Sequence, residues 1–207
     1  MLKFKQYINE VNKEFKDNGL TIFDIDDTLF HTTAKIAVMK DGKKVKELTN
    51  QQFNTYKLKA GEKFDFKQFK DADKFYKESQ PIEKMLNKAK AIIKNIGKKP
   101  GSRIVIITAR NDFNNKQKFL KTFTKYGLDM RKIRVERAGK INDVSNVALK
   151  KVVIIRNYLN TGNFKRARLF DDSMANLRAF LQMKREFPQV TFEAYFAKPD
   201  GSVKVVK

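Results

Sequence analysis

The sequence predicts an α/β protein with a doubly wound parallel sheet and a small insertion after the first strand. From residue 81 onward, short apolar runs typical of buried strands alternate with segments of helical periodicity. Three predicted strands are followed directly by carboxylate or hydroxyl side chains, and parallel strands bring their carboxyl ends to one edge of a sheet, where ligands bind. We therefore expect one core, formed by residues 1–30 and 81–207, with a functional site at that edge.

The composition is that of a folded protein with one sizeable core. The chain has 207 residues, of which 41% are hydrophobic, and it contains no cysteine. Without thiols, disulfide frameworks, thiolate nucleophiles and cysteine-bound metals are excluded. The longest aliphatic runs, 104–107 and 152–155, are far shorter than the roughly 20 residues that span a bilayer, and the charged amino-terminal stretch lacks the apolar core of a secretory signal. We expect a soluble, cytoplasmic protein with no membrane partner.

Positive charge is the strongest feature of the composition. Lys and Arg number 45 against 23 Asp and Glu, which gives a formal net charge of +22. Such a potential favours polyanions, of which nucleic acid is the commonest, and it makes their binding depend on salt. A lysine-rich composition also gives a basic surface without any dedicated partner. The charge alone leaves both interpretations open.

The amino-terminal part of the chain predicts a helix, a buried strand and then a small insertion. Apolar side chains recur at helical spacing over residues 4–15, and the buried strand follows them. Apolar residues on both sides of Asp41-Gly42 predict a β-hairpin over residues 34–48. We expect residues 31–80 to form the small insertion. Its aromatic side chains either pack as a core of their own or stack bases beside the lysines, and we favour packing for Phe53, Tyr56, Phe64 and Phe69.

Strands and helices alternate through the rest of the chain. Pro81 is a favoured first helical residue and opens a periodic segment that ends at Gly97. The segments that follow alternate in type, as in a doubly wound sheet. The predicted strands are 20–23, 103–108, 133–135, 167–170 and 190–197, and the further predicted helices are 119–126, 152–159 and 174–187.

Acidic residues gather at the end of the first predicted strand, in the run Asp24-Ile25-Asp26-Asp27-Thr28. Like charges this close repel one another, and ordinary folding gives no reason to collect them. Two other strand ends carry Thr108 and the pair Asp171-Asp172. Because parallel strands end at the same edge, these side chains are expected to converge on one crevice. A divalent cation or a phosphate-handling site would account for such a crevice.

These segments resemble the four motifs of the haloacid dehalogenase (HAD) superfamily: Asp24-x-Asp26-x-Thr28-Leu29, Thr108, a downstream lysine and Asp171-Asp172. They occur in the family's order over nearly the whole chain. The resemblance implies a HAD-like, Rossmann-like core and a cap, residues 31–80, that covers the site. It also implies a phosphoric monoester hydrolase that works through an aspartyl-phosphate on Asp24, with Asp26 as general acid and base and Asp27 as a spacer.

The same resemblance implies roles for the other site residues. Thr108 would hydrogen-bond a phosphoryl oxygen, and Thr28 belongs to the substrate-binding set. The expected cofactor is Mg²⁺, a hard cation that takes oxygen ligands. Its ligands would be a carboxylate oxygen of Asp24, the backbone carbonyl of Asp26, and Asp171 with Asp172 beside it.

The family's third motif supplies a lysine, for which Lys140, Lys150 and Lys151 are candidates. We choose Lys151, because the run that it begins opens the helix before the Asp171 strand. A second resemblance, to the phosphatase domain of viral polynucleotide kinase-phosphatases, has a similar lysine-helix-strand-Asp-Asp layout. Those enzymes also carry an arginine shortly after the second-motif hydroxyl, matched here by Arg110.

Arg110 would therefore bind substrate phosphate with its planar fork of donors, and the alternative is an ion pair with Asp112 or another acid. Two further polar residues have open roles. Asn176 would orient Asp172 or cap a helix, and the only histidine, His31, lies close enough to the first motif to touch a substrate.

The favoured substrate is a phosphorylated nucleic-acid end of DNA or RNA, carrying a 3′-phosphate, or a nucleotide. A small-molecule nucleotidase is the runner-up among enzymes. The rival from another class is a non-catalytic nucleic-acid-binding protein, such as a phage accessory protein, that keeps the fold. If the chain is viral, its expected compartment is the host cytoplasm.

Overall fold

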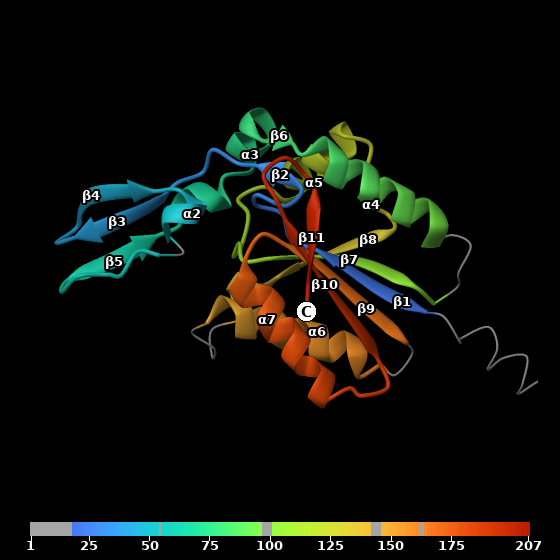
Figure 1. Ribbon diagram of the computed structural model, residues 1–207. Helices are drawn as coiled ribbons and strands as arrows, with labels where there is room; N and C mark the ends of the chain where they lie inside the picture. Colours follow the sequence, from blue (N-terminus) through green and yellow to red (C-terminus); the bar gives the residue numbers. More distant parts are fainter. Residues whose placement is uncertain (1–17, 54, 97–100, 142–145, 162–163) are drawn as a thin grey trace, which may run out of the picture.

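The computed structural model describes residues 18–53, 55–96, 101–141, 146–161 and 164–207 (Figure 1). The helix predicted over residues 4–15 lies outside these ranges. Among the residues that the structure describes, no helix is both long enough and apolar enough to cross a membrane.

A central sheet of six strands confirms the predicted mixed α/β fold. Its strand order is β11-β10-β9-β1-β7-β8, and every neighbouring pair is parallel except β10 with β11. The central strand β1 is buried at all five residues, as its apolar sequence predicts. The strands are β1 (Gly19–Phe23), β7 (Arg103–Thr108), β8 (Ile133–Arg137), β9 (Arg166–Asp171), β10 (Thr191–Ala197) and β11 (Val203–Val206).

Helices cover both faces of this sheet, and each face has its own apolar core. Side chains of β1 point alternately to the two faces, so Phe23 joins one core and Ile22 the other. Figure 1 shows α6 and α7 on one side of the sheet and α4 on the other. The helices are α4 (Glu83–Ile96) and α5 (Lys116–Lys125) on the Phe23 face, and α6 (Val147–Leu159) and α7 (Met174–Gln182) on the Ile22 face.

The insertion after β1 forms a second, three-stranded antiparallel sheet that projects from the core (Figure 1). The predicted hairpin is confirmed, with Asp41 and Gly42 at positive φ in its turn. The aromatic residues Phe53, Tyr56, Phe64 and Phe69 pack against Ile36, Val38 and Leu48, so the packing interpretation is confirmed. The strands are β3 (Ile36–Lys40), β4 (Lys43–Leu48) and β5 (Glu62–Asp65), and short helices lie at α2 (Asn50–Phe53) and η1 (Lys67–Lys70).

The insertion returns to the main core through α3 (Ala72–Glu78). Its Phe75 is buried in the core of the Phe23 face and stacks on Phe119 of α5, with 5.1 Å between ring centroids. The separate core of the insertion therefore ends near Phe69.

The predicted helix start at Pro81 is wrong. Pro81 belongs to β6 (Gln80–Pro81), which pairs with β2 (Phe30–His31), and α4 begins two residues later at Glu83. Proline has no N–H to donate, so it suits the edge of a two-stranded pair as well as a first helical turn. The pairing closes the base of the insertion, since β2 and β6 are its two ends.

Three other features differ from the prediction. Helix α6 starts at Val147 and not at residue 152, because Asn146 caps it by accepting from the N–H groups of Ala148 (2.8 Å) and Leu149 (3.4 Å). The 190–197 strand is not the last, since β11 pairs antiparallel with it across a turn in which Gly201 has φ 76°. The predicted 174–187 helix stops as an α-helix at Gln182 and continues as the 3₁₀ turn η3 (Met183–Arg185).

Candidate active site

A tight turn after β1 places the acidic run at the carboxyl edge of the sheet. The carbonyl oxygen of Ile25 accepts from the N–H groups of Leu29 (2.9 Å) and Phe30 (3.0 Å), and all three residues are fully buried. The N–H of Asp24 donates to Phe170 O (3.0 Å) on neighbouring β9. These apolar anchors hold the polar side chains of the turn against the ends of the parallel strands.

Lys151 lies between two carboxylates that come from different strands. Its Nζ is 2.6 Å from Asp24 Oδ1 and 2.8 Å from Asp171 Oδ2, and all three residues are buried. The other two candidate lysines lie elsewhere: Lys140 pairs with Asp112 at 2.9 Å, and Lys150, which is half-buried, has no ion pair among the described residues. The lysine at the site is Lys151, although it sits in the second turn of α6 and does not open the helix.

Three carboxylates meet at this point. Asp24, Asp171 and Asp172 each offer one oxygen, and these oxygens all lie within 4.8 Å of one another. Asn176 of α7 donates to both oxygens of Asp171, at 2.9 and 3.1 Å. It therefore orients Asp171, and neither of its predicted uses, orienting Asp172 or capping a helix, is found.

The charges at the site are not balanced. Burial, together with the carboxylates of Asp171 and Asp26, raises the pKa of Asp24 to about 7 against the opposing effect of Lys151. Burial, and then Asp24 and Asp171, raise the pKa of Asp172 to about 9. Burial acts to lower the pKa of Lys151, but Asp171 and Asp24 more than offset it, so its pKa is raised and the ammonium stays charged.

A single ammonium thus faces three crowded carboxylates. A hard divalent cation takes oxygen ligands of this kind, and its charge would favour the ionised form of each acid. Asp24, Asp171 and Asp172 together could hold such a cation.

Replacement of Asp172 by asparagine should prevent a loss of folding stability that the wild type shows as pH rises. The pKa of Asp172 is about 9 in the folded protein and 3.8 when unperturbed, so the folded state binds more protons between these values. Stability without divalent cations should therefore fall as pH rises through this window. Near its upper end, Asp172→Asn should raise the melting temperature in EDTA, by about 2–4 °C for each kcal/mol gained, and should weaken the stabilisation that Mg²⁺ gives the wild type.

Asp200→Asn is the control for this experiment. Asp200 is an exposed carboxylate whose pKa is lowered by hydrogen bonds from Ser202 and by Lys84. Its replacement should leave the melting temperature unchanged or lower it. If both variants shifted the melting temperature alike, crowding at the three-carboxylate site would not be the cause.

Asp26 and Arg110 form a bidentate ion pair. Arg110 Nε lies 3.0 Å from Asp26 Oδ2, and its Nη2 lies 2.7 Å from Asp26 Oδ1, while Nη1 donates to the carbonyl oxygen of Phe69 (3.1 Å). The guanidinium also lies over the rings of Phe75 and Phe69, at 4.5 and 5.0 Å from their centroids. Thr32 adds a hydrogen bond to Asp26 (2.8 Å).

The alternative for Arg110, an ion pair with an acid, is therefore the observed arrangement, and the acid is Asp26. Asp112 pairs instead with Arg137 and Lys140. The Arg110 side chain is only 1% exposed. Two of its five N–H donors, one on each terminal nitrogen, remain for other acceptors.

The two predicted threonines are fully buried beside these charged groups. Thr108 Oγ1 accepts from the N–H of Arg110 (3.1 Å), which leaves its own hydroxyl proton free to donate. Thr28 Oγ1 has no hydrogen-bond partner among the described residues. Each hydroxyl can therefore still donate one hydrogen bond.

Asp27 does more than separate its neighbours. It adopts φ 56°, a conformation that aspartate and asparagine tolerate. Its carboxylate lies 3.2 Å from His31 Nδ1 and accepts from Asn50 Nδ2 (3.1 Å) at the start of α2. His31 Nε2 in turn lies 3.0 Å from Pro199 O, between β10 and β11. Sequence reasoning missed this link between the turn, the insertion and the carboxyl-terminal hairpin, because His31 and its partner Pro199 are 168 residues apart.

The structure thus brings together most of the predicted set. Asp24, Lys151 and Asp171 are in direct contact, with Asp172 beside them. Asp26, in the same turn as Asp24, forms a second pair with Arg110 from the loop after β7. The chain matches no protein-family model, and comparison with curated proteins gives no match either.

Proposed function

We propose that this protein is a Mg²⁺-dependent phosphatase of the HAD type that hydrolyses a phosphomonoester. The observation that carries the proposal is the placement of Lys151 Nζ between Asp24 and Asp171, at 2.6 and 2.8 Å, in a site where a third carboxylate lies within 4.8 Å. An ordinary fold gains little from crowding three carboxylates, two of them buried, against one ammonium. A site that handles phosphate with a divalent cation does.

Asp24 is the nucleophile in this proposal. Lys151 holds Asp24 Oδ1, so Oδ2 is the oxygen that attacks phosphorus. The bond from phosphorus to the leaving oxygen breaks as the bond to Asp24 forms, and water then cleaves the aspartyl-phosphate and restores the carboxylate. A cation held by Asp24, Asp171 and Asp172, with the Asp26 carbonyl, would supply positive charge against the phosphoryl oxygens.

Asp26 gives a proton to the leaving oxygen and later takes one from the attacking water. In the structure it is bound by Arg110 and Thr32, so it must loosen the ion pair when it is protonated. The guanidinium donors released in this way would then face the phosphoryl oxygens. Thr108, with its free hydroxyl proton, would donate to the same group.

The favoured substrate is a nucleic-acid end with a 3′-phosphate, or a nucleotide, because the net charge of +22 attracts polyanions. A small-molecule nucleotidase remains the second candidate. The non-catalytic alternative is less favourable, since a buried acidic cluster repels a polyanion and a binding protein has no use for it.

The test is release of inorganic phosphate from oligonucleotides phosphorylated at the 3′ or the 5′ end, from mononucleotides and from sugar phosphates. We expect release that requires Mg²⁺ and stops in EDTA, with the highest kcat/KM on an oligonucleotide, and an apparent affinity that falls steeply with salt. Turnover of mononucleotides alone would favour the nucleotidase. Tight binding of DNA or RNA without release from any substrate would support the non-catalytic alternative.

A further inference from the structure

The segment 116–140 carries an unusual density of positive charge. It holds nine of the chain's 45 basic residues within 25 of its 207 positions, and only two acids, Asp129 and Glu136. This segment comprises α5 and β8 with the loop between them. We call its exposed basic side chains the basic edge: Lys116, Lys121, Lys125, Arg131, Lys132, Arg134 and Lys140.

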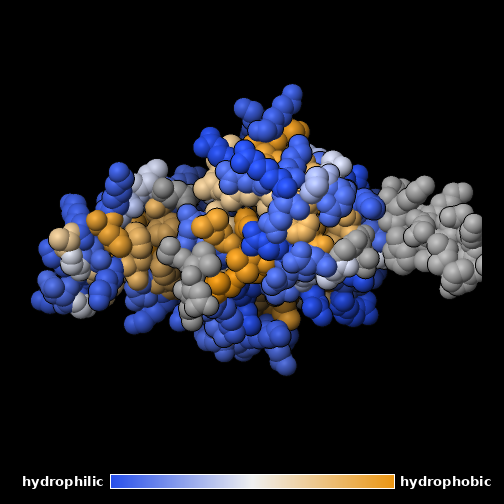
Figure 2. All heavy atoms as spheres, turned by 90° about the horizontal axis from the view of Figure 1, so that it is seen from below, coloured by the Kyte–Doolittle hydropathy of each residue, from blue (hydrophilic) through white to orange (hydrophobic). Residues whose placement is uncertain are grey.

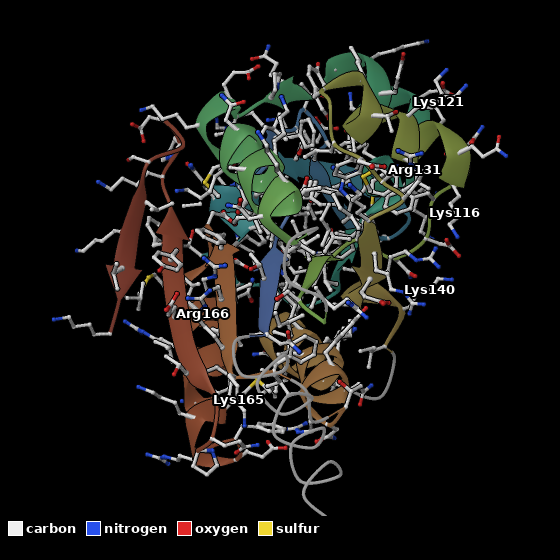
Figure 3. All side chains as sticks on the ribbon, turned by 90° about the vertical axis from the view of Figure 1, so that its right-hand side faces the viewer. Lys116, Lys121, Arg131, Lys140, Lys165 and Arg166 are labelled. Atoms are coloured by element: carbon white, nitrogen blue, oxygen red, sulfur yellow. The ribbon has the colours of Figure 1, made fainter. Side chains whose placement is uncertain are left out.

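These side chains lie along one side of the molecule. Figure 3 shows Lys121, Arg131, Lys116 and Lys140 following the edge formed by α5 and β8, whereas Lys165 and Arg166 lie apart from them. Strand β8 is the last strand of the central sheet. Helix α5 carries Lys116, Lys121 and Lys125, and its ten residues span about 15 Å, the length of several phosphates of one nucleic-acid strand. The surface is therefore long enough to follow a polynucleotide backbone.

The basic edge begins beside the candidate active site. Thr108 of β7 is the register partner of Arg137 at the end of β8. The next turn, η2 (Ala138–Lys140), lies directly against the loop that carries Arg110, since a Cβ on Gly139 would come within 2.4 Å of Ala109 O. Lys140, the residue after Gly139, therefore lies beside the loop that carries Arg110.

The local acids do not neutralise this surface. Asp129 is shared by Arg131 and Lys132, and Asp112 by Arg137 and Lys140. Glu136 accepts from Tyr158 (2.6 Å) on α6. Lys116 and Lys121 have no ion-pair partner among the residues that the structure describes. A net positive potential remains along the whole edge.

We propose that the basic edge binds the backbone of a polynucleotide whose phosphorylated end lies in the candidate active site. This inference rests on the proposed function and extends it from the reacting phosphate to the rest of the substrate. A different use of the same charges is protection of the outer strand β8 against pairing with other strands. That use predicts no difference between oligonucleotides and small phosphate esters.

The test compares two variants that remove the same charges. The edge variant is Lys116→Gln, Lys121→Gln, Arg131→Gln and Lys140→Gln. The matched control removes three exposed lysines and one exposed arginine elsewhere: Lys165→Gln, Lys184→Gln, Arg185→Gln and Lys204→Gln. The affinity for a fluorescent oligonucleotide without a terminal phosphate is measured at several salt concentrations. The rate of p-nitrophenyl phosphate hydrolysis is measured for the same proteins.

We expect the edge variant to bind the oligonucleotide at least about 10-fold more weakly than the control, and its slope of log affinity against log salt to fall by up to about 3 for four lost phosphate contacts to a single strand. Its kcat/KM for p-nitrophenyl phosphate should match that of the wild type. Equal losses in the two variants would overturn the inference, because binding would then follow net charge and not this surface.

Different measurements test the phosphatase activity and the binding of a polynucleotide by the basic edge. If the wild type did not hydrolyse p-nitrophenyl phosphate or any other ester, the proposed function would be wrong, and the binding measurement would still decide the basic edge. If hydrolysis were present but both variants bound like the wild type, only the basic edge would be wrong.

Discussion

Asp24→Asn is expected to abolish phosphate release, with a fall in kcat of about 10⁴-fold or more, as for single residues of other catalytic units. The amide has nearly the shape of the carboxylate but is too weak a nucleophile to form the phosphoenzyme. The measurement is steady-state release with Mg²⁺ present, together with acid quenching to detect phosphate bound to the protein. The phosphoenzyme should appear in the wild type and be missing in the variant.

The fold should survive this change. The pKa of Asp24 is raised to about 7, mainly by burial, so an uncharged side chain relieves repulsion at the site, and Lys151 keeps its contact with Asp171. The control is Asp27→Asn, three residues away, at φ 56° where asparagine is also tolerated. It should leave the chemical step intact. Equal activity in Asp24→Asn and the wild type would remove Asp24 as nucleophile.

The fold was predictable from the sequence because its signals are local. The runs that became β1 and β7 are short, apolar and contain several branched side chains, and β9 carries the apolar pair Leu169-Phe170. A polar residue, Asp24, Thr108 or Asp171, ends or directly follows each run, so the parallel sheet and the edge with the candidate site follow together. Figure 2 shows one face of the molecule from below, with hydrophilic residues around its outside and hydrophobic residues across its middle. Strand β11 was missed because Val203–Val206 is short and half exposed.

The contacts within the site were less predictable, because they join residues far apart in the chain. Asp26 and Arg110 are separated by 84 residues, and the sequence alone allows either side chain to form an ion pair with another residue. The sequence places Arg110 two residues after Thr108, but only the fold decides that the guanidinium pairs with Asp26 and not with Asp112. Asn176 illustrates the same limit: its spacing from the Asp171-Asp172 pair is compatible with either acid, and the start of α7 turns its amide toward Asp171.

Lys151→Met should cost more stability than any other single change at the site. It leaves Asp24 and Asp171 buried without their counter-charge, and the loss of one partner from a buried pair costs about 3–5 kcal/mol. The corresponding fall in melting temperature for a chain of this size is about 6–20 °C. Differential scanning calorimetry in EDTA measures it directly.

Lys150→Met is the matched control, since Lys150 is the adjacent residue of α6 and has no ion pair among the described residues. This substitution should change the free energy of unfolding by no more than about 0.5 kcal/mol. Two conditions should reduce the difference in melting temperature between Lys151→Met and Lys150→Met. Below a pH of about 7 Asp24 becomes protonated and no longer needs a counter-charge, and bound Mg²⁺ would supply part of the neutralisation. If this difference in melting temperature were the same in EDTA and in Mg²⁺, the cation would not bind the carboxylates that contact Lys151. The proposed metal site would then lie elsewhere.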